Sequence, residues 1–125
     1  MSAIAPRETI LVADDEPSVL KLTGTILSRS GYRVLAAQDG NKALELFQEQ
    51  SVDLVLTDVV MPMLTGPQLM RRIHAVKAGV PCIFMSGYTP EQIREKGAES
   101  PGCNYLQKPF TADMLLTMVR RELAA

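Results

Sequence analysis

The sequence predicts an α/β fold with a five-stranded parallel sheet and helices on both of its faces. Short apolar runs alternate along the chain with longer segments whose apolar residues recur at helical spacing. The apolar runs are continuous rather than interrupted by polar residues, which is typical of strands that are buried on both faces of a parallel sheet. Five such runs alternating with five helical segments therefore favour a sheet covered by helices on each side.

The first half of the chain holds three of the expected strands, at residues 10–13, 34–37 and 54–57. The first helix begins at Pro17, which suits the first turn of a helix, and Gly31 closes it. Its apolar stripe is expected to consist of Val19, Leu22, Thr23, Ile26 and Leu27. A turn at residues 39–41 is expected before a second helix that contains Ala43, Leu44 and Phe47.

The second half holds the remaining strands, at residues 82–85 and 104–106. A third helix opens at Gly66 and ends at Gly79, and its apolar residues are Leu69, Met70, Ile73 and Val76. A short helix is expected over residues 90–96, followed by irregular backbone that is rich in Gly and Pro. Thr111 suits the cap of a last helix, whose apolar face is expected to hold Met114, Leu115, Met118, Val119 and Leu123.

Composition narrows the possible classes of function. The 125 residues are 46% hydrophobic, and we expect a single domain over residues 1–125 with its core at about 8–123. The net charge of −1 offers no electrostatic footprint for nucleic acid or an anionic membrane. No apolar run approaches the roughly 20 residues that span a bilayer, and the first residues lack the pattern of a signal peptide. We therefore expect a cytoplasmic monomer that binds neither nucleic acid nor membrane.

Cysteine, histidine and methionine give no sign of a further site. Cys82 and Cys103 lack the CxxC spacing of metal or redox sites, so both are expected to be reduced structural thiols. His74 is expected on the surface of the third helix. Met61 and Met63 are expected to be partly exposed in the loop that follows Asp58.

Polar residues follow the expected strands at one edge of the sheet. Ligands of an open α/β sheet bind beyond the carboxyl ends of its strands. Three carboxylates that lie close together repel one another, and a hard divalent cation such as Mg²⁺ removes that repulsion. A carboxylate can then attack a phosphoryl group while a lysine and a hydroxyl stabilise its oxygens. The residues at these strand ends are Asp14, Asp15, Glu16, Asp58, Ser86 and Lys108.

Four stretches of the sequence carry motifs in a fixed order: LVADDE at 11–16, LTDVVMP at 56–62, MSG at 85–87 and YLQKPF at 105–110. Together they resemble the motifs of response-regulator receiver domains from two-component signalling systems. The resemblance is co-linear and runs from about residue 8 to residue 123. It implies the flavodoxin-like (βα)5 fold and a domain that accepts a phosphoryl group from a phospho-histidine and then changes conformation.

The resemblance also implies a role for each residue at the strand ends. Asp58 is implied to be the phosphoacceptor. Asp14 and Asp15 are implied to hold Mg²⁺, or Mn²⁺, together with Asp58 and the backbone carbonyl of Val60. Lys108 is implied to contact the phosphoryl group, and the peptide bond after it is implied to be cis.

The resemblance further implies that four residues near this cluster control the conformational switch and the lifetime of the phosphoryl group. The Ser86 hydroxyl is implied to move towards the phosphate, and the Tyr105 ring to turn into the space that this frees. Val60 and Tyr88, two residues beyond the acceptor and the hydroxyl, are implied to tune the attack of water on the aspartyl phosphate.

The expected partner is a histidine kinase or a histidine phosphotransfer domain, in cis or in trans. It is expected to dock against Pro17, Leu20 and Phe110. Leu20 lies off the expected apolar stripe of its helix, so we expect it to be more exposed than Leu22. Residues 84–89 and 106–111 most resemble receivers at the C-terminal end of hybrid sensor histidine kinases, so the chain is expected to be part of such a kinase or a stand-alone receiver.

Two alternatives use the same strand-end residues. A small Mg²⁺-dependent phosphatase of the haloacid-dehalogenase type also forms an aspartyl phosphate, but it needs an acid two residues after the nucleophile, where this chain has Val60. A degenerate receiver acts only as a protein-binding module, but such proteins usually lose the acceptor, an acidic partner or the lysine. As an active receiver, the chain is expected not to be a conventional enzyme but to catalyse its own aspartate phosphorylation and dephosphorylation.

Overall fold

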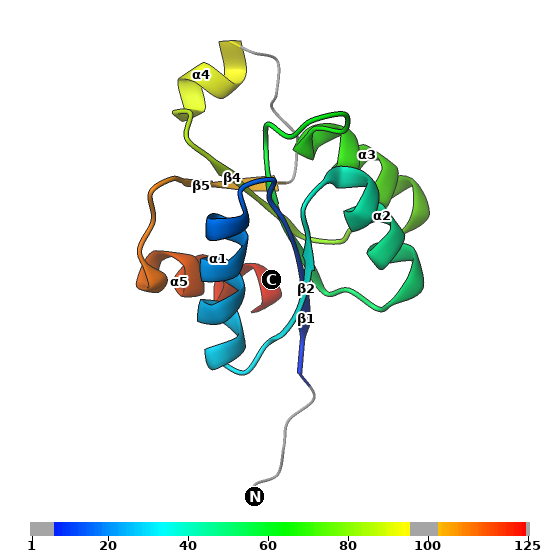
Figure 1. Cartoon of the computed structure of the whole chain (residues 1–125), viewed down its shortest axis with the longest axis vertical. Helices are drawn as coiled ribbons and strands as arrows, with labels where there is room; N and C mark the ends of the chain where they lie inside the picture. Colours follow the sequence, from blue (N-terminus) through cyan, green and yellow to red (C-terminus); the bar gives the residue numbers. More distant parts are fainter. Residues whose placement is uncertain (1–6, 96–102, 125) are drawn as a thin grey trace, which may run out of the picture.

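The computed structural model describes residues 7–95 and 103–124, and a parallel sheet forms its centre. The strand order is β2-β1-β3-β4-β5. Figure 1 shows α1 and α5 on one side of the sheet and α2 and α3 on the other, so the predicted fold class is confirmed. The strands are β1 (Thr9–Ala13), β2 (Arg33–Ala37), β3 (Leu54–Asp58), β4 (Cys82–Ser86) and β5 (Cys103–Gln107). The helices are α1 (Pro17–Arg29), α2 (Gly40–Glu49), α3 (Gly66–Val76), α4 (Pro90–Glu95) and α5 (Ala112–Ala124).

Two apolar clusters pack on opposite faces of the sheet. Successive strand residues point to alternate faces, so Leu11 and Val55 join the cluster under α2 and α3, whereas Ile10 and Leu54 join the cluster under α1 and α5. The three central strands are buried throughout, as continuous apolar runs predict. The expectation of burial on both faces is wrong for the edge strands β2 and β5, which are partly exposed because each has only one neighbouring strand.

Two glycines allow the helices of one face to approach the end of β3. A side chain at Gly66 would place its Cβ only 2.3 Å from the carbonyl oxygen of Asp58, so only glycine fits at the start of α3. A Cβ at Gly40 would lie 2.7 Å from that of Leu64, in the loop before α3. Gly40 also begins α2, with Asp39 as its N-cap, so the turn expected at residues 39–41 is instead the first turn of a helix.

The apolar stripe of α1 is rotated from the predicted one. Leu20 is only 8% exposed and packs in the cluster under α1 and α5, whereas Leu22 is 59% exposed. The buried residues of α1 are Leu20, Thr23 and Leu27, at positions i, i+3 and i+7 of a helix. The prediction that Leu20 is more exposed than Leu22 is therefore wrong.

Other predictions of exposure hold only in part. Met63 is 80% exposed with a positive φ of 67°, but Met61 is buried. Val76 and Met114, which were expected on apolar faces, are largely exposed. His74 is half-buried rather than a plain surface residue, and its Nε2 lies 2.9 Å from the carbonyl oxygen of Val80.

The expected short helix at 90–96 is present as α4, and the irregular backbone expected at 97–102 lies outside the described residues. Within the described ranges, no helix combines the length and the apolar character needed to cross a membrane.

Candidate functional site

Three carboxylates meet where β1 and β3 end. These strands are neighbours in the sheet, so the residues that follow β1 face the last residue of β3. One oxygen each from Asp14, Asp15 and Asp58 lies within 4.8 Å of the others. Asp14 is fully buried, Asp58 is nearly so and Asp15 is exposed. The cluster is therefore open to solvent on the side of Asp15.

Backbone hydrogen bonds fix the orientation of Asp14. Its N–H donates to the carbonyl oxygen of Ala37 at 3.1 Å, which continues the pairing of β1 with β2. Its Oδ1 accepts from the N–H of Glu16 at 2.9 Å. Its second oxygen is thereby directed towards the ammonium group of Lys108.

Lys108 bridges the two buried carboxylates. Its Nζ lies 2.8 Å from Oδ2 of Asp14 and 3.4 Å from Oδ2 of Asp58. Its backbone N–H donates to the carbonyl oxygen of Ser86 at 2.7 Å, which ties the end of β5 to the end of β4. The Lys108–Pro109 peptide bond is cis, as predicted. One cation thus serves the two buried carboxylates at the ends of β1 and β3, and its Nζ also lies 3.8 Å from Oε1 of the exposed Glu16.

The pKa values at the site reflect burial first and the neighbouring charges second. Burial raises the pKa of Asp58 above its ordinary value of 3.8. The charge of Lys108 opposes this rise, but the nearby charge of Asp14 adds to it. Burial lowers the pKa of Lys108, but its hydrogen bond to Asp14 and the charges of Asp58 and Asp14 outweigh burial and raise that pKa. The carboxylate of Asp58 is therefore under-compensated, while the lysine is held firmly as a cation.

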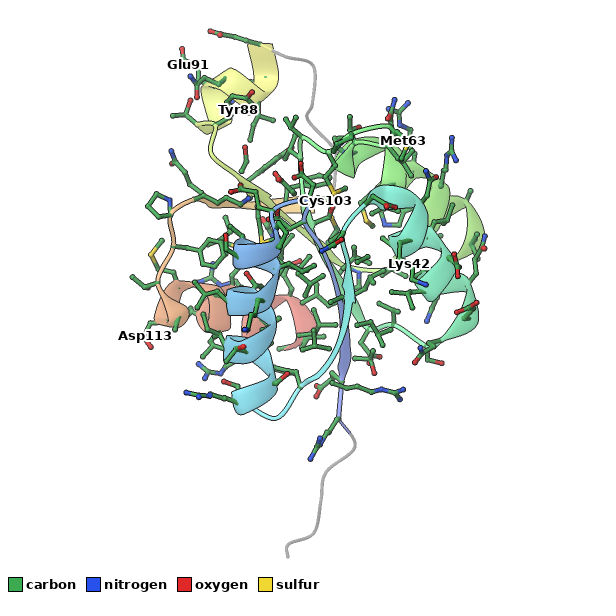
Figure 2. All side chains as sticks on the ribbon, viewed as in Figure 1. Lys42, Met63, Tyr88, Glu91, Cys103 and Asp113 are labelled. Carbon is green, nitrogen blue, oxygen red and sulfur yellow. The ribbon has the colours of Figure 1, made fainter. Side chains whose placement is uncertain are left out.

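The hydroxyl and aromatic residues expected in the switch lie along β4 and β5. Ser86 is buried at the end of β4, and its Oγ accepts from the N–H of Tyr88 at 2.9 Å. Tyr105 is half-buried and pairs in register with Phe84, with 5.5 Å between the ring centroids. Val60 is 52% exposed just beyond Asp58. Figure 2 shows Tyr88 beside α4 and Met63 near the start of α3.

The structure places the three expected docking residues in different environments. Pro17 is exposed at the start of α1. Phe110 is half-buried and packs against the cluster under α1 and α5. Leu20 belongs to that same cluster, so it is a core residue, and its expected role as an exposed docking residue is wrong.

The acidic cluster fits a small divalent cation. Oxygen ligands of Mg²⁺ lie about 2.1 Å from the ion and are hence at most about 4.2 Å from one another. One oxygen from each of the three aspartates lies within 4.8 Å of the others, so small side-chain movements bring them into that range. Oxygen is the donor that Mg²⁺ prefers, and an added cation would favour the charged form of Asp58, whose pKa is raised by burial and by the charge of Asp14. Asp14, Asp15 and Asp58 are thus the residues suited to hold the metal.

Sequence reasoning missed the part played by Gly66. We interpreted Gly66 and Pro67 only as the opening of a helix, whereas the close approach of Gly66 to the carbonyl of Asp58 sets how tightly α3 packs behind the site. The backbone N–H of Val60 was also missed as a hydrogen-bond donor that lowers the pKa of Asp58. The spacing of Gly66 from Asp58 was the available signal for the role of Gly66. No signal in the sequence marks the hydrogen bond from the backbone of Val60.

Comparisons with known proteins identify one family. Residues 10–120 match the family model described as "Response regulator receiver domain". A "Probable transcriptional regulator ycf27" of Guillardia theta is 35% identical over 117 residues, which cover 94% of this chain and 46% of that protein. The "Sensor kinase CckA" of Brucella abortus is 34% identical over 117 residues, which cover 92% of this chain and 12% of that protein. The chain therefore spans about half the length of the first relative and much less of the second.

A solved structure supports the same family. The chemotaxis protein CheY4 of Vibrio cholerae superposes with a TM-score of 0.84 at 28% identity, covering 94% of this chain and 99% of that one. The matched fold, the matched family model and the carboxylate–lysine cluster agree with one another. The chain belongs to the response regulator receiver domain family and is a phosphoacceptor domain of two-component signalling.

Proposed function

We propose that Asp58 is the residue that accepts the phosphoryl group. The observation that carries this proposal is the position of Asp58, which ends a buried strand 3.4 Å from the ammonium of Lys108 and beside two further aspartates. An under-compensated carboxylate gains most from a cation and has an oxygen available for attack. Asp14 is fully buried and hydrogen-bonded on both oxygens, so it suits metal binding better than attack.

In the proposed reaction, a carboxylate oxygen of Asp58 attacks the phosphorus atom of a phospho-histidine. The new O–P bond forms as the P–N bond breaks, and the imidazole nitrogen keeps the electron pair and later takes a proton. Lys108 and the Ser86 hydroxyl would donate to the phosphoryl oxygens, where charge develops. Bound Mg²⁺, held by Asp14, Asp15, Asp58 and the carbonyl of Val60, would supply electrostatic stabilisation of the same oxygens. Mn²⁺ would serve equally through the same oxygen ligands.

The proposed switch begins at Ser86. Its Oγ is engaged by the N–H of Tyr88, and a phosphoryl group on Asp58 would compete for the hydroxyl. Its movement would free space into which the half-buried ring of Tyr105, now packed against Phe84, would turn. Two arrangements of these side chains give the domain its two states.

Val60 and Tyr88 are proposed to set the lifetime of the aspartyl phosphate. Val60 is exposed beside Asp58 and has no group that can orient a water molecule. Tyr88 follows Ser86 closely enough for its ring to shield the phosphoryl group. Hydrolysis without a partner is therefore proposed to be slow to moderate.

The proposed phosphodonor is a histidine kinase or a histidine phosphotransfer domain, in cis or in trans. Pro17 is exposed and Phe110 is half-buried, and they flank the site from α1 and from the loop before α5. These two residues are the proposed contacts. The domain is further proposed to be one unit over residues 1–125 that acts as a monomer.

The test is phosphorylation by acetyl phosphate, followed by intact mass. We expect wild-type protein to gain one phosphoryl group with Mg²⁺ and none with EDTA. Asp58→Asn should gain none under either condition. The matched control is Asp53→Asn, an exposed aspartate of the loop before β3, which should be phosphorylated like the wild type. An undiminished adduct on Asp58→Asn would remove Asp58 from this role.

A further inference from the structure

Two thiols that play no part in the phosphoryl site are neighbours at the start of β4 and β5. Cys82 pairs in register with Cys103, as the first residues of two adjacent parallel strands. Both side chains join the cluster under α2 and α3, so they point to the same face of the sheet. The Cys82 thiol forms a side-chain hydrogen bond with that of Cys103. The sequence separates these residues widely, but the fold places their sulfur atoms together.

The spacing of the two strands suits a covalent bond between the sulfur atoms. Adjacent strands lie about 4.8 Å apart. Disulfides join residues whose Cα atoms are about 4.4–6.8 Å apart. The Cβ atoms of a disulfide lie closer together than strand spacing alone provides, so the bond requires a small shift of one strand. Cys103 opens the edge strand β5, which has a neighbour on one side only and can make that shift.

The two thiols differ in access to solvent. Cys82 is fully buried, whereas Cys103, labelled in Figure 2, is half-buried. Burial raises the pKa of Cys82 well above its ordinary value of 9.0, and the hydrogen bond with Cys103 adds to this shift. Because Cys103 is the more exposed of the two thiols, it is the one that meets an oxidant first.

We propose that Cys82 and Cys103 form a peroxide-oxidisable dithiol that closes a reversible disulfide between β4 and β5 in the folded domain. The sulfur of Cys103 attacks one oxygen of hydrogen peroxide, the O–O bond breaks, and a sulfenic acid and one water form. The sulfur of Cys82 then attacks the sulfenic sulfur, the S–S bond forms and a second water leaves. The two thiols together lose two electrons and two protons, and the peroxide is reduced to two waters.

The bond would tie together the strands that carry the switch residues. Cys103 lies two residues before Tyr105 on the same face of β5, and Cys82 lies two residues before Phe84 on β4. The loop that the bond closes contains Ser86, Tyr88 and α4. The inference is independent of the proposed phosphorylation, because neither sulfur touches Asp58 or Lys108.

The experiment is a mild hydrogen peroxide treatment of the reduced, natively folded chain, followed by intact mass and non-reducing peptide mapping. We expect a mass loss of two hydrogen atoms, a peptide that links Cys82 to Cys103, and a monomer by gel filtration. Dithiothreitol should restore the original mass. The melting temperature of the oxidised form should exceed that of the reduced form, since the bond restrains the unfolded chain.

Cys103→Ser is the matched variant, because its half-buried edge position tolerates a hydroxyl. It should lose both the linked peptide and the oxidative rise in melting temperature. Cys82→Ala gives a second check at the buried position, with folding verified by its own thermal transition. The proposal is overturned if Cys103 gains oxygen atoms while Cys82 stays a thiol. A disulfide that joins two chains, or one that forms only in denaturant, would also overturn it.

Discussion

The two ends of the sheet hold their charged groups in opposite ways. At the amino end, the carboxylate of Asp53 accepts a hydrogen bond from the N–H of Thr9 at 2.7 Å and stays exposed. At the carboxyl end, Asp14 and Asp58 are buried side by side and share a single ammonium, that of Lys108. Asp53 has a hydrogen-bond donor of its own, whereas the two buried aspartates at the carboxyl end share one cation between them.

This difference separates a structural role from a chemical one. A carboxylate that only supports the fold is matched and solvated, as Asp53 is. A carboxylate buried beside another carboxylate destabilises the folded state, and natural proteins tolerate such destabilising pairs mainly at functional sites. The raised pKa of Asp58 is the physical mark of that destabilisation. A cation and a phosphoryl group are both proposed to bind where the fold has left this imbalance.

The largest effect is expected from removing the shared cation. Lys108→Met should slow phosphorylation by acetyl phosphate by about 100- to 1,000-fold, as expected for loss of one donor to a developing oxyanion. The matched control is Lys42→Met, which removes an exposed lysine paired with Glu45 at 3.4 Å on α2. Its rate should match the wild type. Equal rates for both variants would show that Lys108 does not act on the phosphoryl group.

Neutralising one aspartate at each end should change stability with opposite sign. In metal-free protein at neutral pH, Asp58→Asn should raise the melting temperature because it removes the under-compensated charge. Asp53→Ala should lower the free energy of unfolding by about 1 kcal/mol because it leaves the Thr9 N–H without its acceptor. Thermal and urea denaturation measure both. A loss of stability in Asp58→Asn would contradict the imbalance at the carboxyl end.

The same imbalance predicts a pH dependence. The pKa of Asp58 is raised in the folded state, so the folded protein holds this proton at pH values where the unfolded chain has lost it. The stability that this proton confers is present below pH 3.8 and is lost as the pH rises through the folded-state pKa.

Urea denaturation of metal-free protein from neutral to acid pH tests that sign. The advantage of Asp58→Asn over the wild type should be full at neutral pH and shrink as the pH falls through the pKa of Asp58. An advantage that stays constant or grows towards acid pH would assign the effect to something other than the charge.

The smallest effect is expected from substitutions of Val60 and Tyr88, which should change only the lifetime of the phosphoryl group. Val60→Asn supplies a group that can orient water, so it should shorten this lifetime by a few-fold. Tyr88→Ala should act in the same direction by removing a shield. Decay of the phosphorylated protein after removal of the donor measures both. If neither substitution changes the decay, water reaches the phosphoryl group by a route that these side chains do not control.

The strand ends could be predicted from the sequence because their signals are local. Each central strand is a continuous apolar run that stops at a polar residue, and parallel strands end at a common edge. That reasoning placed Asp14, Asp58, Ser86 and Lys108 at one edge, where the structure has them.

The rotation of helix α1 and the pairing of the two cysteines could not be predicted from the sequence, because both depend on tertiary contacts. Residue Leu22 extends one side of the apolar stripe of α1 and Leu20 the other, so the sequence leaves the rotation of the helix open until α5 packs against it. The pairing of Cys82 with Cys103 depends on the register of β4 and β5, which no local pattern encodes.

The most direct test of the account is to locate the phosphoryl group on a single carboxylate. After phosphorylation with acetyl phosphate and Mg²⁺, borohydride reduces an aspartyl phosphate to homoserine, and peptide mass spectrometry then finds the altered residue. The account predicts homoserine at position 58 alone, with Asp14, Asp15 and Asp53 unchanged. Homoserine at Asp14 or Asp15, or at no aspartate despite a phosphoryl adduct in the intact mass, would contradict it.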